Sequence, residues 1–179
     1  MNNFISFSEK NNIAFLQNEP LAKHSTFRIG KNALLAIFPD TTEKIIDTVR
    51  FFKESGEKFL VLGKGSNVLF PDYDIEYPII FTERAAAIEK TGENTISAEA
   101  GATLSRVASF GMSHNLGGFE FASGIPGTVG GAVVMNAGAY GKNISDVLVK
   151  TEYLGSDGEN HTITNKEHLF GYRKSVFTA

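Results

Sequence analysis

Short apolar runs alternate with polar loops along the chain, and their spacing predicts both strands and helices. The apolar run Ala33–Phe38 predicts a buried strand. Asp40 follows as a predicted helix N-cap, with Glu43 three residues further on at the spacing of a capping box. The helix is expected to end near Gly56, and its apolar stripe comprises Ile45, Ile46, Val49, Phe51 and Phe52.

Several further strands are predicted in the middle of the chain. Phe59–Leu62 predicts a strand, and the tight loop Gly63–Asn67 separates it from another apolar run, Val68–Phe70, which we expect to form a strand as well. The apolar runs Ile79–Thr82 and Thr95–Glu99 predict two more strands.

The second half of the chain predicts a helix and a hairpin on either side of a glycine-rich stretch. Thr103–His114 has helical spacing, and Val147–Leu154 is joined to a second run near Thr162 by the turn signal Ser156–Gly158. No internal repeat is present, so the mixture of elements indicates an α+β protein. The predicted core side chains of the helix are Leu104, Val107, Ala108 and Phe110.

Composition and charge narrow the possible partners. The chain has 179 residues, which suits one domain or two small lobes, and its 42% hydrophobic and 21% charged residues are typical of a folded protein. Lys and Arg number 17 against 20 Asp and Glu, a net charge of −3, so we expect neither nucleic acid nor a membrane surface as partner. Cysteine is absent, which excludes disulfides, zinc–thiolate sites and a cysteine nucleophile.

Targeting and metal signals are also missing from the sequence. Residues 1–12 lack the basic and long apolar regions of an export signal, and the apolar runs are shorter than the roughly 20 residues that span a bilayer. We therefore expect a cytoplasmic protein. The four histidines have no metal-ligand spacing, so we expect no metal site; they are His24, His114, His161 and His168.

Glycine is concentrated in two places that could hold a ligand. In the loop Gly63-Lys64-Gly65-Ser66-Asn67, two glycines let backbone N–H groups converge on an anion, and Ser66 and Asn67 add side-chain donors. The loop fits neither the Rossmann nor the P-loop pattern, and a bulged hairpin loop is an alternative interpretation.

The second concentration gives a stronger signal. Ten of the 18 glycines lie between Gly101 and Gly141, and the run Ser123-Gly124-Ile125-Pro126-Gly127-Thr128-Val129-Gly130-Gly131 is made mostly of small residues. A flat ligand could lie against this bare main chain, and a helix starting near Thr128 would aim its first N–H groups at negative charge. Close packing of two backbone segments is the alternative.

These segments, taken in order along the chain, resemble the UDP-N-acetylenolpyruvoylglucosamine reductase (MurB) family. The resemblance covers about residues 20–177 and includes Tyr172 and Arg173. Considered alone, these two residues would suggest a surface turn. The matching segments are Ser25–Gly30, Gly63–Asn67, Ala100–Ala102, Gly117–Glu120, Ser123–Gly131, Asn136–Gly141 and Tyr172–Ser175.

The resemblance implies an α+β, two-lobed FAD-binding domain of the vanillyl-alcohol-oxidase (PCMH) type. It implies an N-terminal segment at residues 1–20, a first lobe at about 21–83 and a second, incomplete lobe at about 84–179. FAD would be held non-covalently by Gly63, Lys64, Gly65, Ser66, Asn67, Gly101, Ser123, Gly124, Ile125, Pro126, Gly127, Thr128, Gly130, Gly131, Asn136, Gly138 and Ala139.

The family's activity defines the remaining expectations. NADPH would reduce the flavin, hydride would pass to the enolpyruvyl ether of a UDP-sugar, and Arg173 would stabilise the charge on the substrate carboxylate beside Tyr172. The family's proton-donating serine and its catalytic glutamate belong to a C-terminal substrate domain that this chain lacks, and Ser175 is not that serine. We therefore expect this chain alone to be inactive. The alternatives are a catalytically dead flavin- or nucleotide-binding module that acts through partners, and another PCMH-type flavin oxidoreductase.

Overall fold

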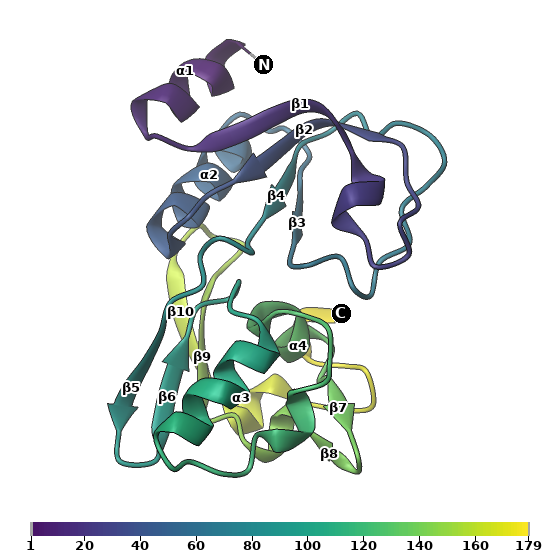
Figure 1. The fold of residues 1–179 in the computed structure, drawn as a ribbon. Helices are drawn as coiled ribbons and strands as arrows, with labels where there is room; N and C mark the ends of the chain where they lie inside the picture. The colour runs from purple at the N-terminus through teal and green to yellow at the C-terminus, as the bar shows by residue number, and fades with distance from the viewer. Residues whose placement is uncertain (1, 179) are drawn as a thin grey trace. The chain divides into compact units, whose positions relative to one another are not determined.

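The computed structural model describes residues 2–178, and the chain divides into two compact units that meet in sequence at Ala86 and Ala87. The first unit is built around one sheet with the strand order β1-β2-β4-β3. Strand β1 is antiparallel to β2, whereas β4 runs parallel to both β2 and β3 (Figure 1). The strands are β1 (Ala14–Pro20), β2 (Asn32–Phe38), β3 (Leu60–Leu62) and β4 (Ile79–Phe81).

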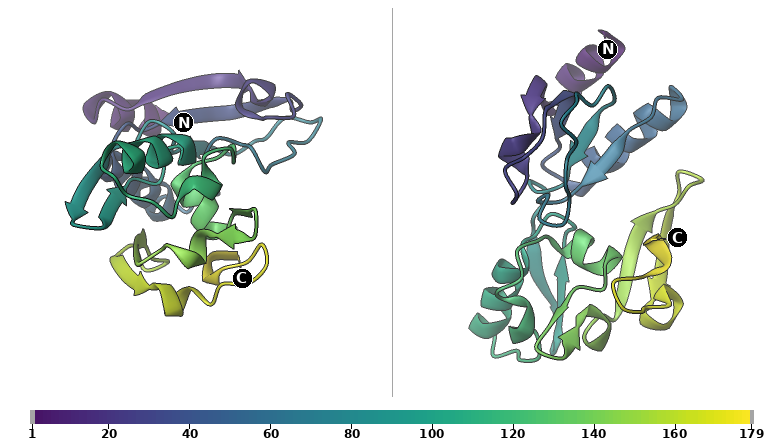
Figure 2. Two further views of the ribbon diagram at one scale, coloured as in Figure 1. Left: turned by 60° about the horizontal axis from the view of Figure 1, so that its bottom comes forward. Right: turned by 90° about the vertical axis from the view of Figure 1, so that its right-hand side faces the viewer.

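The central strands of the first unit's sheet, β2 and β4, are largely buried, whereas most residues of the edge strand β1 are exposed. Helices α1 (Asn2–Lys10) and α2 (Thr42–Glu54) meet through Phe4 and Phe52, whose stacked ring centroids are 5.1 Å apart. On the other face, Leu21 of the short helix η1 (Leu21–His24) joins a core cluster. The right-hand view of Figure 2 shows α2 and η1 on opposite sides of the strands. Burial on both faces explains the continuous apolar sequence of β2. The cluster on the η1 side comprises Leu21, Ala33, Ala36, Phe38, Phe70, Ile75, Ile79 and Phe81.

Helix α2 begins one residue later than its sequence predicts. Thr41, not Asp40, is the N-cap, and its hydroxyl oxygen accepts a hydrogen bond from the Lys44 N–H at 3.2 Å. The Asp40 carboxylate instead pairs with the Lys44 ammonium at 2.7 Å. Either residue type can cap a helix, and sequence spacing alone does not separate adjacent candidates. Gly56 follows the last turn with φ +69°, as predicted.

The predicted strand Val68–Phe70 is wrong. Phe70 is buried in the core cluster and Leu69 is 69% exposed, so the side chains alternate as in a strand, but no ladder forms. Strand β4 runs parallel to β3, so the chain must cross back before it can pair again, and residues 68–70 lie on that crossing. The alternation of side chains in this segment correctly indicates which of them are buried, but it does not show that the segment pairs with another strand.

The second unit begins with a hairpin and a helix. Strand β6 (Thr95–Ala98) was predicted, whereas its antiparallel partner β5 (Ile88–Gly92) was missed because exposed polar residues dominate it. Helix α3 (Leu104–Ser113) follows the N-cap Thr103, and it buries Leu104, Val107 and Gly111. Ala108 and Phe110 are only half-buried.

A second core forms around the glycine-rich stretch. The short helix α4 (Val129–Val134) packs with the turn η2 (Glu120–Ala122), and the small hairpin of β7 (Gly138–Ala139) and β8 (Lys142–Asn143) leads into η3 (Ile144–Asp146). The buried residues of this cluster are Leu104, Phe121, Ala122, Ala132, Val133, Ala137 and Ile144.

The predicted hairpin near the C-terminal end is confirmed. Strands β9 (Lys150–Leu154) and β10 (Asn160–Thr164) are antiparallel, and η4 (Asn165–His168) and η5 (Val176–Thr178) follow them. Phe177 packs edge-on against Tyr153 of β9, with ring centroids 5.1 Å apart, so η5 lies beside the hairpin (Figure 2, right).

Among the described residues, no helix is long and apolar enough to cross a membrane, and no group of three or more acidic or histidine side chains could hold a metal ion.

Candidate functional site

The first glycine loop, Gly63–Asn67, is held against the main chain of its own unit. Gly65 is buried with φ +64°, and a Cβ there would overlap the carbonyl oxygen of His24. The Gly65 carbonyl also accepts a weak hydrogen bond from the Thr26 N–H at 3.4 Å. Packing within the protein therefore requires glycine at position 65. Lys64 and Asn67 are exposed on the loop, and Ser66 is half-buried.

A hydrogen bond between two mostly buried side chains supports the segment that Gly65 touches. Glu19 is 8% exposed, and its carboxylate lies 3.0 Å from Nε2 of His24. The His24 ring packs against both Phe38 and Phe81, which also stack on each other, and its centroid lies 5.5 and 4.7 Å from theirs. These contacts hold His24 against the glycine loop. Two polar residues five positions apart give no periodic signal, so the sequence pattern does not predict this contact.

The second glycine segment, Ser123–Gly131, contains the start of α4. The N–H groups of Val129 and Gly130 donate to the carbonyl oxygens of Ala102 and Ala100, at 2.8 and 2.9 Å. The prediction that the first N–H groups of this helix point at a ligand is therefore wrong for these two. The segment around Gly101 satisfies them because it pairs with Thr128 through an antiparallel bridge at Thr103. No local pattern predicts that these two stretches meet.

One polar atom at the start of α4 is buried without a partner. The hydroxyl oxygen of Thr128 is the one buried side-chain polar atom without a hydrogen bond among the described residues, and Thr128 itself is 2% exposed. Buried polar groups are normally paired, so an unpaired atom of this kind marks a place where a ligand fits. Gly131, three residues further along the chain, is exposed and leaves its main chain open to a ligand.

The surroundings of these groups are bare main chain. A Cβ built on Gly124 would meet no atom within 4 Å, and one built on Gly131 would touch only the Thr128 hydroxyl, at 3.6 Å. Gly130 is different, because its Cβ would lie 3.0 Å from that of Ala100. The open glycines and the unpaired Thr128 hydroxyl together suit a polar, flat-faced ligand such as a dinucleotide cofactor.

Glycine at position 138 has an internal cause. A Cβ there would lie 2.5 Å from the Lys142 carbonyl oxygen, across the β7–β8 hairpin. The predictions that Gly138 and its neighbour Ala139 contact the cofactor stay predictions, since close approach of the two strands already accounts for the glycine.

The turn that carries Tyr172 and Arg173 projects from the second unit. Tyr172 is 96% exposed, Arg173 is exposed with φ +55°, and the turn is closed by a 3.0 Å hydrogen bond from the Gly171 N–H to the Lys174 carbonyl. A left-handed conformation is uncommon for arginine, and it presents this side chain at the tip of the turn.

Asn136 and Ser175 connect this turn to the end of α4. The Asn136 side chain donates to the Gly171 carbonyl at 3.1 Å, and its amide oxygen accepts from the Ser145 N–H at 3.0 Å. Ser175 is fully buried, and its hydroxyl donates to the Val134 carbonyl at 2.7 Å. Asn136 was predicted to lie at the cofactor, and its side chain is engaged with protein groups instead.

Glu120 orders the loop that precedes the second segment. Its carboxylate accepts from the Gly118 N–H at 2.8 and 2.9 Å. Hydrogen bonds from its own N–H and from that of Gly118 hold the pKa of Glu120 below its usual value.

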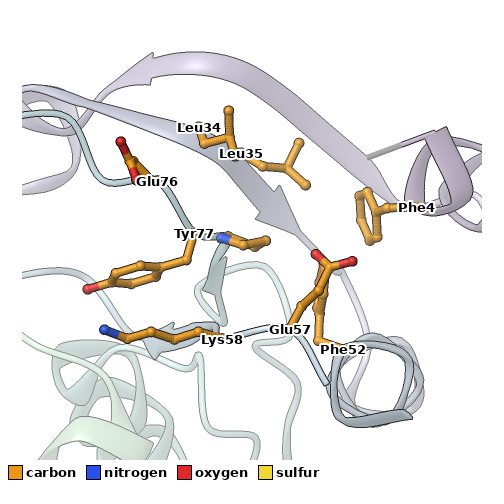
Figure 3. A pocket seen from close by; sticks show the side chains of 9 residues that line it. Phe4, Leu34, Leu35, Phe52, Glu57, Lys58, Glu76 and Tyr77 are labelled. Atoms are coloured by element: carbon orange, nitrogen blue, oxygen red, sulfur yellow. The ribbon is translucent and has the colours of Figure 1, made fainter. Parts of the chain in front are cut away.

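A separate pocket of about 220 Å³ opens in the first unit. Figure 3 shows Lys58 extended alongside Tyr77, with Phe4 and Phe52 at the other end of the pocket. The Lys58 ammonium lies 4.2 Å from the centre of the Tyr77 ring. None of the residues that line this pocket belongs to the predicted site.

The fold and the second segment together define a flavin-binding protein. The family model described as an FAD binding domain matches residues 33–164, and the chain belongs to this family. Similar curated proteins are the UDP-N-acetylenolpyruvoylglucosamine reductases of Clostridium botulinum (strain Alaska E43 / Type E3), 43% identical over 160 residues, and of Geobacillus kaustophilus (strain HTA426), 39% identical over 163 residues. The matches cover 89% and 91% of this chain and 52% and 53% of those proteins, so the chain spans about half their length.

Solved structures agree with this assignment. UDP-N-acetylenolpyruvylglucosamine reductase (MurB) from Thermus caldophilus matches with a TM-score of 0.70 and 28% identity, over 91% of this chain and 56% of that one. Cholesterol oxidase from B. sterolicum, at a TM-score of 0.62 and 16% identity, covers 86% of this chain and 33% of its own, and shares the fold alone. The predicted family resemblance, the α+β FAD-binding fold of the PCMH type and FAD as cofactor are confirmed.

Proposed function

We propose that this chain is the FAD-binding part of an enzyme that uses NADPH to reduce UDP-N-acetylglucosamine enolpyruvate to UDP-N-acetylmuramate, a step of peptidoglycan precursor synthesis. The relatives named UDP-N-acetylenolpyruvoylglucosamine reductase support this reaction class. The observation that carries the proposal for this chain is the unpaired Thr128 hydroxyl within the second glycine segment.

The chain's own residues have two proposed tasks. FAD, when bound, would supply the hydride chemistry. Main chain and small side chains of Gly63–Asn67 and Ser123–Gly131 would hold it without a covalent bond, since the first loop contains no histidine and the chain no cysteine. Thr128 would direct its unpaired hydroxyl at the polar atoms of FAD, and Gly131 would offer exposed main chain beside it. The further cofactor contacts in this proposal are Gly101, Gly138 and Ala139.

Arg173 and Tyr172 would contact the substrate. A guanidinium can meet the enolpyruvyl carboxylate with two parallel hydrogen bonds, which become stronger as negative charge builds there. Ser175 would not donate a proton, because its hydroxyl is buried and already donates to the Val134 carbonyl. We propose that the proton donor lies in the part of the relatives that this chain does not match, and that this chain alone does not turn over. A cytoplasmic location would suit the NADPH and UDP-sugar substrates.

Titration of the purified chain with FAD tests the cofactor assignment. We expect the flavin absorbance to shift and its fluorescence to change on binding, and the yellow colour to leave the protein on acid precipitation. Colour that stays in the pellet would indicate covalent attachment and would favour another PCMH-type oxidase. Bound flavin without NADPH oxidation, even when the C-terminal part of a relative is supplied, would favour a flavin-binding module without activity.

Arg173→Ala tests the reaction, in the chain extended by the C-terminal part that its relatives carry. We expect the reduction of UDP-N-acetylglucosamine enolpyruvate to slow by about 10²–10³-fold, because removing one stabiliser of transition-state charge has this effect. The reduction of the flavin by NADPH should stay near normal in stopped-flow absorbance. Equal losses in both half-reactions would contradict the role of Arg173.

A further inference from the structure

The Tyr172–Arg173 turn is fastened to the protein at both of its ends, and both fastenings come from one short stretch. Before the turn, the Gly171 carbonyl accepts from the Asn136 side chain at 3.1 Å. After it, the Ser175 hydroxyl donates to the Val134 carbonyl at 2.7 Å. Val134 is the last residue of α4 and Asn136 lies two residues beyond it. The end of α4 therefore makes one hydrogen bond on each side of the turn.

The other end of the same helix is the candidate cofactor segment. Thr128, with its unpaired hydroxyl, is the N-cap of α4, and the helix has six residues. At 1.5 Å per residue, such a helix spans about 9 Å and has little room to bend. One rigid element thus connects the groups proposed to face FAD with the turn that presents Arg173.

The conformation of Asn136 suits a residue that connects the end of α4 with the turn. Its φ is +42°, a value that asparagine tolerates better than most residues, and it is 9% exposed. Its amide oxygen accepts from the Ser145 N–H at 3.0 Å, so the side chain is held from the opposite side while it donates to Gly171. An asparagine has a donor and an acceptor on one planar group, which both of these contacts need.

We propose that Asn136 and Ser175 are positioning residues, which hold the Arg173 turn at a fixed distance from the flavin segment by way of α4. The inference rests on the proposed function for the role of Arg173, but its structural part is independent of that role. It differs from the sequence expectation that Asn136 contacts FAD, because the side chain acts on the turn.

Asn136→Asp in the 179-residue chain tests the structural part. Aspartate keeps the preference for a left-handed φ and the acceptor for Ser145, but it loses the donor to Gly171. We expect the backbone amides of Gly171 and Lys174 to exchange hydrogen at least about tenfold faster, because one hydrogen bond is lost and the new carboxylate faces the Gly171 carbonyl oxygen. Trypsin should also cleave faster after Arg173. The dissociation constant for FAD should stay within twofold of the unmodified chain.

Asn115→Asp is the matched control, because Asn115 is exposed, has φ +56° and sits outside the turn. In Asn115→Asp, hydrogen exchange at Gly171 and Lys174 and trypsin cleavage after Arg173 should equal those of the unmodified chain. Ser175→Ala should reproduce the faster exchange; if it fails to fold, the comparison of Asn136→Asp with Asn115→Asp decides alone. Unchanged exchange in Asn136→Asp, or a tenfold loss of FAD affinity, would overturn the proposal.

The extended enzyme separates this inference from the proposed function. We expect Asn136→Asp to lower kcat for UDP-N-acetylglucosamine enolpyruvate by about tenfold, with flavin reduction by NADPH unchanged. If Arg173→Ala slows substrate reduction and Asn136→Asp does not, the positioning role is wrong and the function stands. If Arg173→Ala has no effect while exchange at the turn rises in Asn136→Asp, the proposed function fails and the anchoring of the turn stands.

Discussion

The two segments are both rich in glycine, but their main chains have different neighbours. In Gly63–Asn67, the space that a side chain of Gly65 would need is filled by the carbonyl of His24. In Ser123–Gly131, Gly130 packs against Ala100, whereas a Cβ on Gly124 would meet no atom within 4 Å. The first segment uses its buried glycine to pack against its own unit, whereas the second also leaves main chain open at Gly124.

Their polar groups differ in the same way. The Gly65 carbonyl accepts from the Thr26 N–H, whereas the Thr128 hydroxyl finds no protein partner in the described part of the chain. Packing and ligand binding both select glycine, so glycine content alone cannot separate them. Here the occupied Cβ position at Gly65 indicates packing, and the unpaired Thr128 hydroxyl indicates a ligand.

The largest effect is expected from Gly65→Ala. A methyl group there must displace the His24 backbone, and alanine is strained at φ +64°. Together these effects should lower the free energy of unfolding by about 2–4 kcal/mol, measured by urea denaturation. Gly56→Ala is the matched control, since Gly56 has φ +69° with nothing within 4 Å, and it should cost only about 1 kcal/mol. Equal losses in the two variants would show that packing against His24 adds nothing.

Much of the fold could be predicted because it follows from local patterns. The strand at Ala33–Phe38, the end of α2 at Gly56 and the turn at Ser156–Gly158 all depend on residues close in sequence. The choice of Thr41 over Asp40 as helix cap, and the crossing path of Val68–Phe70, depend on tertiary contacts. Sequence patterns do not encode such contacts directly.

The candidate site was predicted in part for the same reason. The motifs located the segments, but not the pairing of Ala100 and Ala102 with the start of α4, which uses two N–H groups expected to face a ligand. Nor could they indicate that Asn136 holds a turn 35 residues away. A motif indicates which residues belong to the site. Long-range contacts decide which of these residues can bind a ligand and which hold other parts of the site in place.

Thr128→Val tests the role of the unpaired hydroxyl in the second segment, Ser123–Gly131. Valine has nearly the same shape and lacks the unpaired hydroxyl, so the free energy of unfolding without FAD should not fall and should rise by up to about 1 kcal/mol. FAD affinity should fall by about tenfold, since one hydrogen bond to the cofactor is lost. Urea denaturation without FAD and a fluorescence titration with it measure the two effects.

Thr103→Val is the contrasting control for that variant. The Thr103 hydroxyl accepts from the Arg106 N–H at 3.4 Å and caps α3, so its loss should destabilise the chain by about 1 kcal/mol. A Thr128→Val chain that is destabilised as much as Thr103→Val, with unchanged FAD affinity, would mean that the Thr128 hydroxyl has an internal role.

The smallest effect concerns the loop before the open segment and depends on pH. Hydrogen bonds from the backbone N–H groups of Glu120 and Gly118 lower the pKa of Glu120 in the folded chain. A carboxylate of this kind stabilises the fold above its unfolded pKa of about 4.3, and the stabilisation is lost as pH falls through the folded value.

Glu120→Gln should therefore lower Tm slightly at pH 7, and the difference from the unmodified chain should shrink as the pH drops below about 4. Thermal unfolding followed by circular dichroism across this range measures it. Glu93→Gln, in the exposed turn between β5 and β6, is the control and should follow the unmodified chain throughout. If the Tm difference between Glu120→Gln and the unmodified chain stays constant down to pH 2, the loss of charge has no part in the effect. The glutamine would then change the loop by its shape.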